Sequence, residues 1–278
     1  MFDFFKRLFN KKYKLYYFGG KKNINAGDIF NVDLVKYFNI RCTRSKKIED
    51  ANLICVGSNV DKLSIPSKHK MLIVGAGYIL PPSANDNLGR EIEVLALRGK
   101  LTKSRMEKLL KIKLNDCVLG DPALLISKMY PKNLSKKFKV GIIPHYADKA
   151  LLDETKIYLN KDSYKIIDIQ QKPSNLVSEI CECECILSSS LHGLIFADSY
   201  NIPNRQIIIS DNIIGGNYKF EDYYSAFDMM LPQTIDLRDF IINEELIEKV
   251  VNNYTEKSIY PKQKELIKVF NLIGKRYG

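Results

Sequence analysis

Residues 53–58 read LICVGS and residues 71–77 read MLIVGAG, and these two stretches decide the fold class. In each, four apolar residues lead directly into a glycine-containing turn. Continuous apolar runs of this length are typical of strands buried on both faces of a parallel sheet. Similar runs predict further strands at 14–18, 93–97 and 117–119. Apolar residues at helical spacing predict helices after Asp28 and over 101–112.

A second series of the same kind follows the polar stretch 131–137, which we interpret as a link between domains. Its predicted strands are 140–143, 164–169, 185–187 and 206–209, and its predicted helices are 150–159, 174–183 and 192–200. The tail, 244–278, is expected to form two helices separated by Tyr260-Pro261. Strands that alternate with helices favour βαβ units and parallel sheets. The sequence therefore predicts two doubly wound, Rossmann-like α/β domains, 1–135 and 136–278, that face each other across a cleft.

Composition excludes several classes of protein. With 278 residues and 45% hydrophobic content, the chain has enough apolar residues for a globular core, and no apolar run reaches the ~18 residues of a membrane span. The six cysteines lie mostly in apolar runs, which predicts reduced thiols in a cytoplasmic protein. The CECEC run at 181–185 has no second cysteine or histidine pair at zinc spacing, so we interpret it as packing.

The net charge of +11 raises the alternative of a nucleic-acid-binding module. The lysines are scattered, however, and no basic-helix, zinc-finger or RNA-recognition signature is present, so no nucleic-acid partner is expected. The first residues, MFDFFKRLFNKK, lack a signal-peptide cleavage site and place aromatic residues on one helical face beside lysines. This pattern predicts an interfacial helix at the inner face of a membrane, with an ordinary docking helix as the alternative.

Candidate site residues follow the predicted strands, where open parallel sheets bind ligands. Asn25-Ala26-Gly27-Asp28 opens a helix with free backbone N–H groups that can hold an anion, and Asp28 is expected to be its N-cap. Arg98 follows strand 93–97, where a guanidinium suits a carboxylate or phosphate. Lys219 follows the Gly215-Gly216 turn and is expected at the same edge.

The segment 187–194, LSSSLHGL, places three serines between a buried strand and a helix that begins near His192. A histidine at this position is suited to proton transfer, and His145, which follows another strand, is the second candidate. The alternative is a packing histidine held by hydrogen bonds. A Ser-His-Asp hydrolase is disfavoured because no GxSxG elbow occurs.

Taken together, these segments resemble the polysaccharide pyruvyl transferase family over about residues 14–230. The shared motifs are, in chain order, Asn25-Ala26-Gly27-Asp28, Arg98-Gly99-Lys100-Leu101-Thr102, Gly120-Asp121-Pro122-Ala123-Leu124-Leu125, Ser189-Ser190-Leu191-His192-Gly193 with Ala197, and Lys219-Phe220-Glu221-Asp222-Tyr223-Tyr224. Many members have arginine where this chain has Ser190, and the Ser-Ser-Leu-His variety is similar to the succinoglycan-type branch.

The resemblance implies a GT-B-like fold and a reaction in which phosphoenolpyruvate forms a pyruvate ketal on a sugar of a surface polysaccharide, releasing phosphate. Arg98, Lys219, Ser189, Ser190 and Leu191 are then expected to bind the donor. His192, as proton donor to the methylene carbon, and Asp28 are expected to be catalytic. Asn25, Gly27 and His145 are assigned to the acceptor.

No metal and no cofactor are expected, because lysine and arginine can neutralise the donor. Acceptors in such pathways are commonly lipid-linked oligosaccharides, so a glycan of that kind is the expected partner. Two alternatives stay open from the sequence. One is a nucleotide-sugar glycosyltransferase of similar two-lobed architecture, and the other is an inactive relative that only binds polysaccharide.

Overall fold

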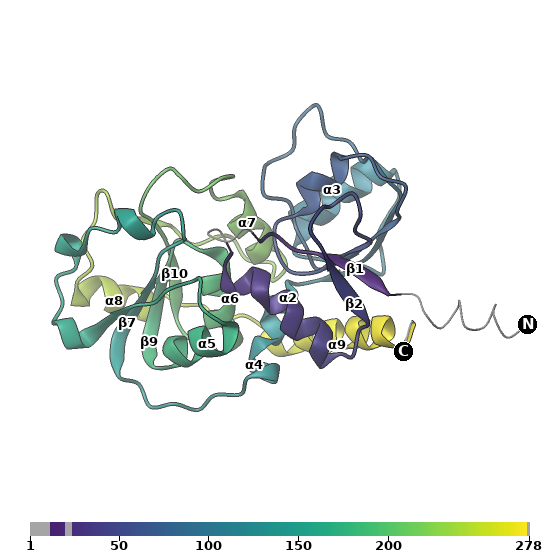
Figure 1. Cartoon of the computed structure of the whole chain (residues 1–278). Helices are drawn as coiled ribbons and strands as arrows, with labels where there is room; N and C mark the ends of the chain where they lie inside the picture. Colours follow the sequence, from purple (N-terminus) through teal and green to yellow (C-terminus); the bar gives the residue numbers. More distant parts are fainter. Residues whose placement is uncertain (1–11, 20–23, 277–278) are drawn as a thin grey trace, which may run out of the picture.

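The computed structural model describes residues 12–19 and 24–276, and within them two sheets are built from parallel strands only (Figure 1). The first sheet has the order β2-β1-β3-β4-β5-β6. Its strands are β1 (Tyr13–Tyr16), β2 (Cys42–Ser45), β3 (Leu53–Ile54), β4 (Met71–Val74), β5 (Ile92–Leu97) and β6 (Val118–Leu119). The apolar runs predicted at 53–56 and 71–74 form the buried centre of this sheet.

The second sheet has the order β11-β10-β9-β7-β8. Its strands are β7 (Phe138–Ile143), β8 (Tyr164–Ile166), β9 (Cys183–Ser188), β10 (Asn204–Ile208) and β11 (Ile235–Asp236). Read from the β8 edge with β7 as strand 1, this order is 2-1-3-4-5. The first five strands of the first sheet have the same order. In each sheet the strand order therefore reverses once, at the neighbouring strands β1 and β3 in the first sheet and β7 and β9 in the second. The prediction of two doubly wound α/β units with parallel sheets is confirmed.

Helices cover both sheets. They are α2 (Ala26–Tyr37), α3 (Lys100–Leu110), α4 (Ile126–Met129), α5 (Pro173–Cys181), α6 (Leu191–Ser199), α7 (Tyr218–Ser225), α8 (Glu244–Asn252) and α9 (Ile259–Arg276). Short 3-10 segments are η1 (Val60–Ser64), η2 (Pro122–Leu125), η3 (Lys149–Leu151), η4 (Glu154–Lys156) and η5 (Lys161–Ser163).

Three sequence-based predictions about helices are corrected by the structure. The predicted helix 150–159 is wrong, because Asp153 accepts hydrogen bonds from the backbone N–H and hydroxyl of Thr155 and so favours a local turn. The N-cap of α2 is Asn25, and Asp28 is the third residue of the helix. Pro261 lies in the first turn of α9, where proline is tolerated, instead of between two helices.

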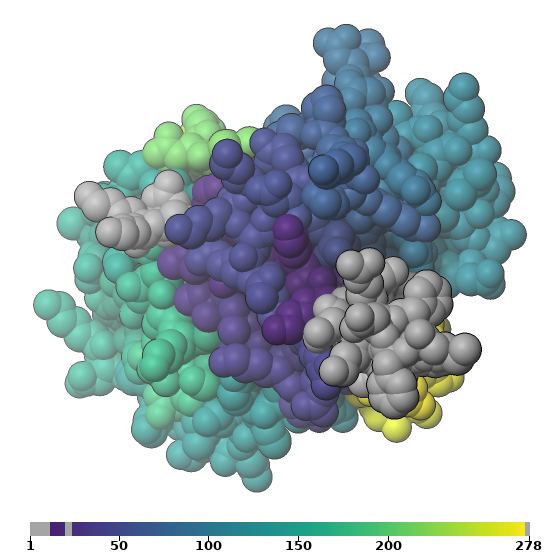
Figure 2. Space-filling model, turned by 45° about the vertical axis from the view of Figure 1, so that its right-hand side comes forward, coloured from purple at the N-terminus to yellow at the C-terminus, as the bar shows by residue number. Residues whose placement is uncertain are grey.

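The two sheet units share one hydrophobic core. Helix α2 of the first unit packs on α5, and the ring of Phe30 lies edge-on to that of Phe196 at 5.9 Å between centroids. Helix α9 returns from the end of the chain to contact β5 and β6 (Figure 1). On the face shown in Figure 2, the purple surface of β1 and α2 meets the teal and green surface of the second unit without a break. The boundary at residues 135 and 136 stays a prediction.

The predicted membrane-contacting helix falls within residues 1–12, of which 1–11 lie outside the described residues. Within the described residues, the structure has no helix of the length and apolar character needed to cross a bilayer.

Candidate active site

A cavity of about 280 Å³ lies where the reversal points of the two sheets face each other. Its walls come from the segments that follow β1, β3 and β4 in the first unit and β7, β9 and β10 in the second. They include Phe18, Asn25, Asp28, Ser58, Asn59, Lys62, His145, Tyr146, Ser190, Leu191, His192 and Lys219. The carboxyl ends of strands at a reversal point leave a crevice for ligands in doubly wound sheets. Here two such crevices combine into one cavity.

His192 lines the cavity from the first turn of α6 and packs directly against the start of α2. A Cβ atom added to Gly27 would lie 2.1 Å from Nδ1 of His192, so only glycine fits there. Nε2 is buried and has no hydrogen-bond partner within the described part of the chain. Burial, together with the charges of Arg98 and Lys219, lowers the pKa of His192 to about 3. The imidazole is therefore neutral at pH 7.

Asp28 lies at the same end of α2 and forms a capping box with Asn25. Its backbone N–H donates to Oδ1 of Asn25 at 3.1 Å, and its carboxylate accepts from the Asn25 backbone N–H at 3.4 Å. Burial raises the pKa of Asp28 to about 7, against the opposing effects of the Asn25 N–H and Lys62. Near neutral pH, the carboxyl group is divided between its protonated and ionised forms.

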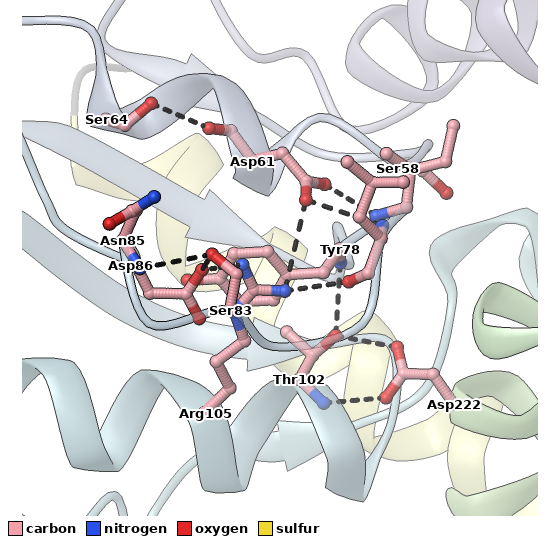
Figure 3. Close-up of polar contacts among 12 residues, drawn as sticks. Ser58, Asp61, Ser64, Tyr78, Ser83, Asn85, Asp86, Thr102, Arg105 and Asp222 are labelled. Atoms are coloured by element: carbon pink, nitrogen blue, oxygen red, sulfur yellow. Dashed lines mark hydrogen bonds and ion pairs between the residues drawn. The ribbon is translucent and has the colours of Figure 1, made fainter. Parts of the chain in front are cut away.

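Arg98 is fully buried and does not line the cavity. Its guanidinium donates to Oδ2 of Asp222 at 2.9 Å, to Oγ of Ser58 at 2.6 Å and to the carbonyl oxygen of Tyr78. Asp222 also accepts from the backbone N–H and hydroxyl of Thr102 (Figure 3). Because Ser58 lines the cavity, Arg98 reaches it through that hydroxyl and through its charge.

Lys219 lines the cavity from α7 and is 7% exposed. Within 12–19 and 24–276, its ammonium makes no hydrogen bond or ion pair, and the ring of Phe220 lies 5.4 Å away. Burial and the charge of Arg98 lower the pKa of Lys219 to about 8, while Asp148 raises it. The group remains largely charged at neutral pH.

The serines of the LSSSLHGL segment have separate roles. Ser190 and Leu191 line the cavity. Ser189 is fully buried, donates to Oδ2 of Asp148 at 2.6 Å and accepts from the backbone N–H of His145 at 2.8 Å. It holds the loops after β7 and β9 together. His145 lines the cavity, and burial lowers its pKa to about 4.

A family model described as polysaccharide pyruvyl transferase matches residues 2–212, which is most of the chain. The chain belongs to the polysaccharide pyruvyl transferase family. The resemblance to this family is confirmed, with four of the five motifs inside the matched residues, and membership identifies a transferase that modifies polysaccharide.

Two relatives of this pyruvyl transferase family member have similar sequences. Uncharacterized protein L143 of Acanthamoeba polyphaga mimivirus is 30% identical over 231 residues, covering 78% of this chain and 75% of that protein. Succinoglycan biosynthesis protein ExoV of Rhizobium meliloti (strain 1021) is 22% identical over 172 residues, covering 62% of this chain and 52% of ExoV. The second match supports the succinoglycan-type branch.

Two solved structures are similar at low sequence identity. Protein KP1_0663 of Klebsiella pneumoniae subsp. pneumoniae NTUH-K2044 has a TM-score of 0.45 and 13% identity, over 84% of this chain and 96% of that one. The H444N variant of the wall teichoic acid polymerase TagF has a TM-score of 0.46 and 15% identity, over 96% and 89% of the two chains.

Several residues in the walls of this family member's cavity were missed by the sequence analysis. Ser58, Asn59 and Lys62 follow β3, and Tyr146 follows β7. Gly57 adopts a positive φ of 115°, which explains the glycine after the LICV run. Because the carboxyl end of β3 lies at the reversal point, the same strand-end argument that selected Arg98 could have found Ser58.

The wall after β3 is held by a polar network (Figure 3). Asp61 accepts from the backbone N–H of Ile79 at 2.5 Å. Arg105 lies over the ring of Tyr78 at 3.7 Å and pairs with Asp86 at 2.6 Å. These contacts fix the turn after β4 against η1.

Asp198 supports the cavity wall formed by α6 and α7, and the sequence analysis did not identify it. It is fully buried and accepts hydrogen bonds at 2.9 Å from Tyr223, Tyr254 and the ammonium of Lys257. These contacts tie α6, which carries His192, to α7, which carries Lys219. Among the described residues, no cluster of three His, Cys, Asp or Glu side chains is placed to hold a metal ion.

Proposed function

We propose that this protein transfers the pyruvyl moiety of phosphoenolpyruvate to a sugar of a cell-surface polysaccharide or its lipid-linked precursor, forming a pyruvate ketal and releasing phosphate. The observation that supports this most directly is that His192, Asp28 and Lys219, from three separate motifs, face one cavity. A volume of about 280 Å³ is near the lower end for ligand sites, which suits a donor as small as phosphoenolpyruvate.

Phosphoenolpyruvate has a carboxylate and a phosphate, so its site needs positive charge and hydrogen-bond donors. Lys219 supplies an ammonium with no carboxylate partner among the described residues, and Ser190 supplies a hydroxyl beside Leu191. Arg98 supports the donor indirectly, because its guanidinium holds Ser58 and adds positive potential. In this proposal, Arg98 acts through Ser58, while Ser189 orders the loops around the donor.

Ketal formation requires that one sugar hydroxyl attacks C2 of the donor while the methylene carbon takes up a proton. The second hydroxyl then replaces phosphate at C2, and its proton leaves with the phosphate. A base and an acid are both needed. Neutral His192 is suited to accept the proton of the attacking hydroxyl, and the protonated carboxyl of Asp28 is suited to supply the methylene proton.

This assignment differs from the expectation that His192 is the proton donor, and the reason is electrostatic. Burial and neighbouring cations hold His192 neutral, whereas burial favours the protonated form of Asp28. An anionic donor in the cavity raises the pKa of both groups, which increases the fraction of Asp28 that is protonated and able to donate.

Asn25 and His145 line the cavity and remain the proposed contacts of the acceptor, whereas Gly27 packs beneath His192. A lipid-linked acceptor agrees with the proposed contact between residues 1–12 and an anionic membrane surface. Sedimentation with anionic vesicles tests that contact: we expect the full chain to pellet and a chain lacking residues 1–12 to stay in the supernatant. Equal pelleting of both contradicts it.

The decisive experiment incubates the protein with phosphoenolpyruvate and candidate lipid-linked oligosaccharides. We expect acceptor-dependent phosphate release together with a new ketal methyl resonance in the NMR spectrum of the glycan. Thermal stabilisation by UDP- or GDP-sugars without stabilisation by phosphoenolpyruvate would identify a nucleotide-sugar glycosyltransferase instead.

A further inference from the structure

The cavity has a second lysine, Lys62, that no sequence motif contains. It belongs to η1, which follows β3, so it comes from the first sheet unit, whereas Lys219 comes from the second. Both side chains line the same cavity. Among the described residues, neither ammonium forms an ion pair with a carboxylate, so each unit contributes a cation to the cavity that is not directly paired.

The ammonium of Lys62 is held in place by aromatic residues. Nζ donates to the hydroxyl of Tyr16 at 2.6 Å and lies 5.0 Å from the centre of that ring. The ring of Phe18 is 4.7 Å from the same nitrogen. Cation–π contacts and one neutral hydrogen bond orient a lysine without cancelling its charge. The remaining N–H groups of the ammonium stay available to an anion.

The two acidic residues nearby, Asp28 and Asp61, form no direct ion pair with Lys62 in the described part of the chain. Asp61 is engaged by the backbone N–H groups of Ile79 and Leu80, at 2.5 and 3.4 Å, and lies 3.9 Å from Arg105. Asp28 is buried, and Lys62 is one of the groups whose charge acts on its carboxyl. The charge of Lys62 therefore acts within the cavity, on Asp28, one of the two residues assigned to proton transfer.

We propose that Lys62 binds the anionic donor from the first sheet unit, while Lys219 binds it from the second. This rests on the proposed function for the identity of the donor as phosphoenolpyruvate. Arg98 cannot take the place of Lys62 directly, because it is fully buried and its guanidinium is bound to Asp222, Ser58 and Tyr78.

Calorimetric titration of the full chain with phosphoenolpyruvate tests the proposal. Lys62→Gln should weaken binding by about 10- to 100-fold, the loss expected for a hydrogen bond to a charged group. Tyr16→Phe retains the ring but removes the hydroxyl that orients Lys62, and should cost less than Lys62→Gln. Lys70→Gln is the matched control, because Lys70 pairs with Glu91 and Glu93 on the surface of the same unit.

Thermal unfolding of each variant separates a binding defect from misfolding, and Lys62→Met provides a second variant that keeps the packing of the alkyl chain. Affinity of folded Lys62→Gln or Lys62→Met equal to that of wild type would overturn the assignment of Lys62 while leaving the proposed function intact. If wild type binds inorganic phosphate or UDP-glucose but not phosphoenolpyruvate, the proposed function fails. The Lys62 variants are then titrated with that anion: weakened binding supports Lys62, and unchanged binding overturns it.

Discussion

Arg98 and Asp222 form an ion pair at 2.9 Å in which both side chains are fully buried. Arg98 follows β5 of the first sheet unit, and Asp222 belongs to α7, next to the second sheet. The pair therefore joins the two units, and Arg98 also contacts the cavity wall through Ser58. Gly99 permits this contact, because a Cβ atom there would lie 1.6 Å from the carbonyl oxygen of Asp222.

Removal of one partner from this pair should destabilise the whole fold. Arg98→Ala leaves the carboxylate of Asp222 buried without its cation, and we expect the free energy of unfolding to fall by about 3–5 kcal/mol in urea titrations. Lys100→Ala is the control, because Lys100 and Asp228 pair in solvent with side chains 49% and 77% exposed, and should cost no more than about 1 kcal/mol. Similar losses for the two variants would contradict a structural role for the Arg98–Asp222 pair.

Arg98→Lys retains the charge but cannot reproduce three hydrogen bonds from one planar group. We expect weaker binding of phosphoenolpyruvate in calorimetry, because Ser58 loses its partner. Undiminished affinity in a folded Arg98→Lys protein would remove Arg98 from the donor site.

His192→Asn should preserve the fold and most of the donor affinity while reducing turnover by about 10²–10⁴, the usual contribution of an acid or base. Phosphate release measures turnover, and melting temperature and calorimetry measure the other two properties. His69→Asn is the control, since His69 lies outside the cavity. A folded His192→Asn protein with wild-type turnover would leave His145 as the next candidate.

Asp28→Asn should change the pH dependence of stability. The carboxyl pKa is about 7 in the folded chain and ordinarily near 3.8, so between these values the native state retains a proton that the unfolded state has released. Stability of the wild type therefore falls as pH rises from about 4 to 7. Asp28→Asn removes this contribution, and we expect it to be stabilised relative to wild type more at pH 8 than at pH 4, as measured by melting temperature.

The exposed Asp50→Asn variant is the control for this pH series. We also expect Asp28→Asn to lose turnover, because an amide cannot supply the methylene proton. Parallel stability curves for wild type and Asp28→Asn across this pH range would exclude a raised carboxyl pKa.

Gly27→Ala should displace the imidazole of His192, because the added methyl group would lie 2.1 Å from Nδ1. We expect a loss of about 1–3 kcal/mol in stability and a fall in turnover. The double variant Gly27→Ala/His192→Ala removes the clash, so its stability loss should be smaller than the sum of the single losses. Additive losses would mean that Gly27 and His192 do not contact each other.

The sequence alone was sufficient for the elements that depend on local patterns. Continuous apolar runs before glycine turns identified β3 and β4, and strand-end motifs brought Asp28, His192 and Lys219 to the correct edge. Such signals are readable because a strand's burial and a turn's backbone geometry depend on adjacent residues. Edge strands β2 and β11 were missed because they are polar or very short.

Only the tertiary structure decided which basic residues reach the cavity and which groups hold a proton. Arg98 forms an ion pair with Asp222, 124 positions later in the chain, and does not line the cavity. Lys62 lines the cavity together with Lys219, although no sequence motif contains it. The low pKa of His192 and the raised pKa of Asp28 follow from burial between two units. Burial and pairing between distant segments arise only when both sheets pack together, so no local pattern contains them.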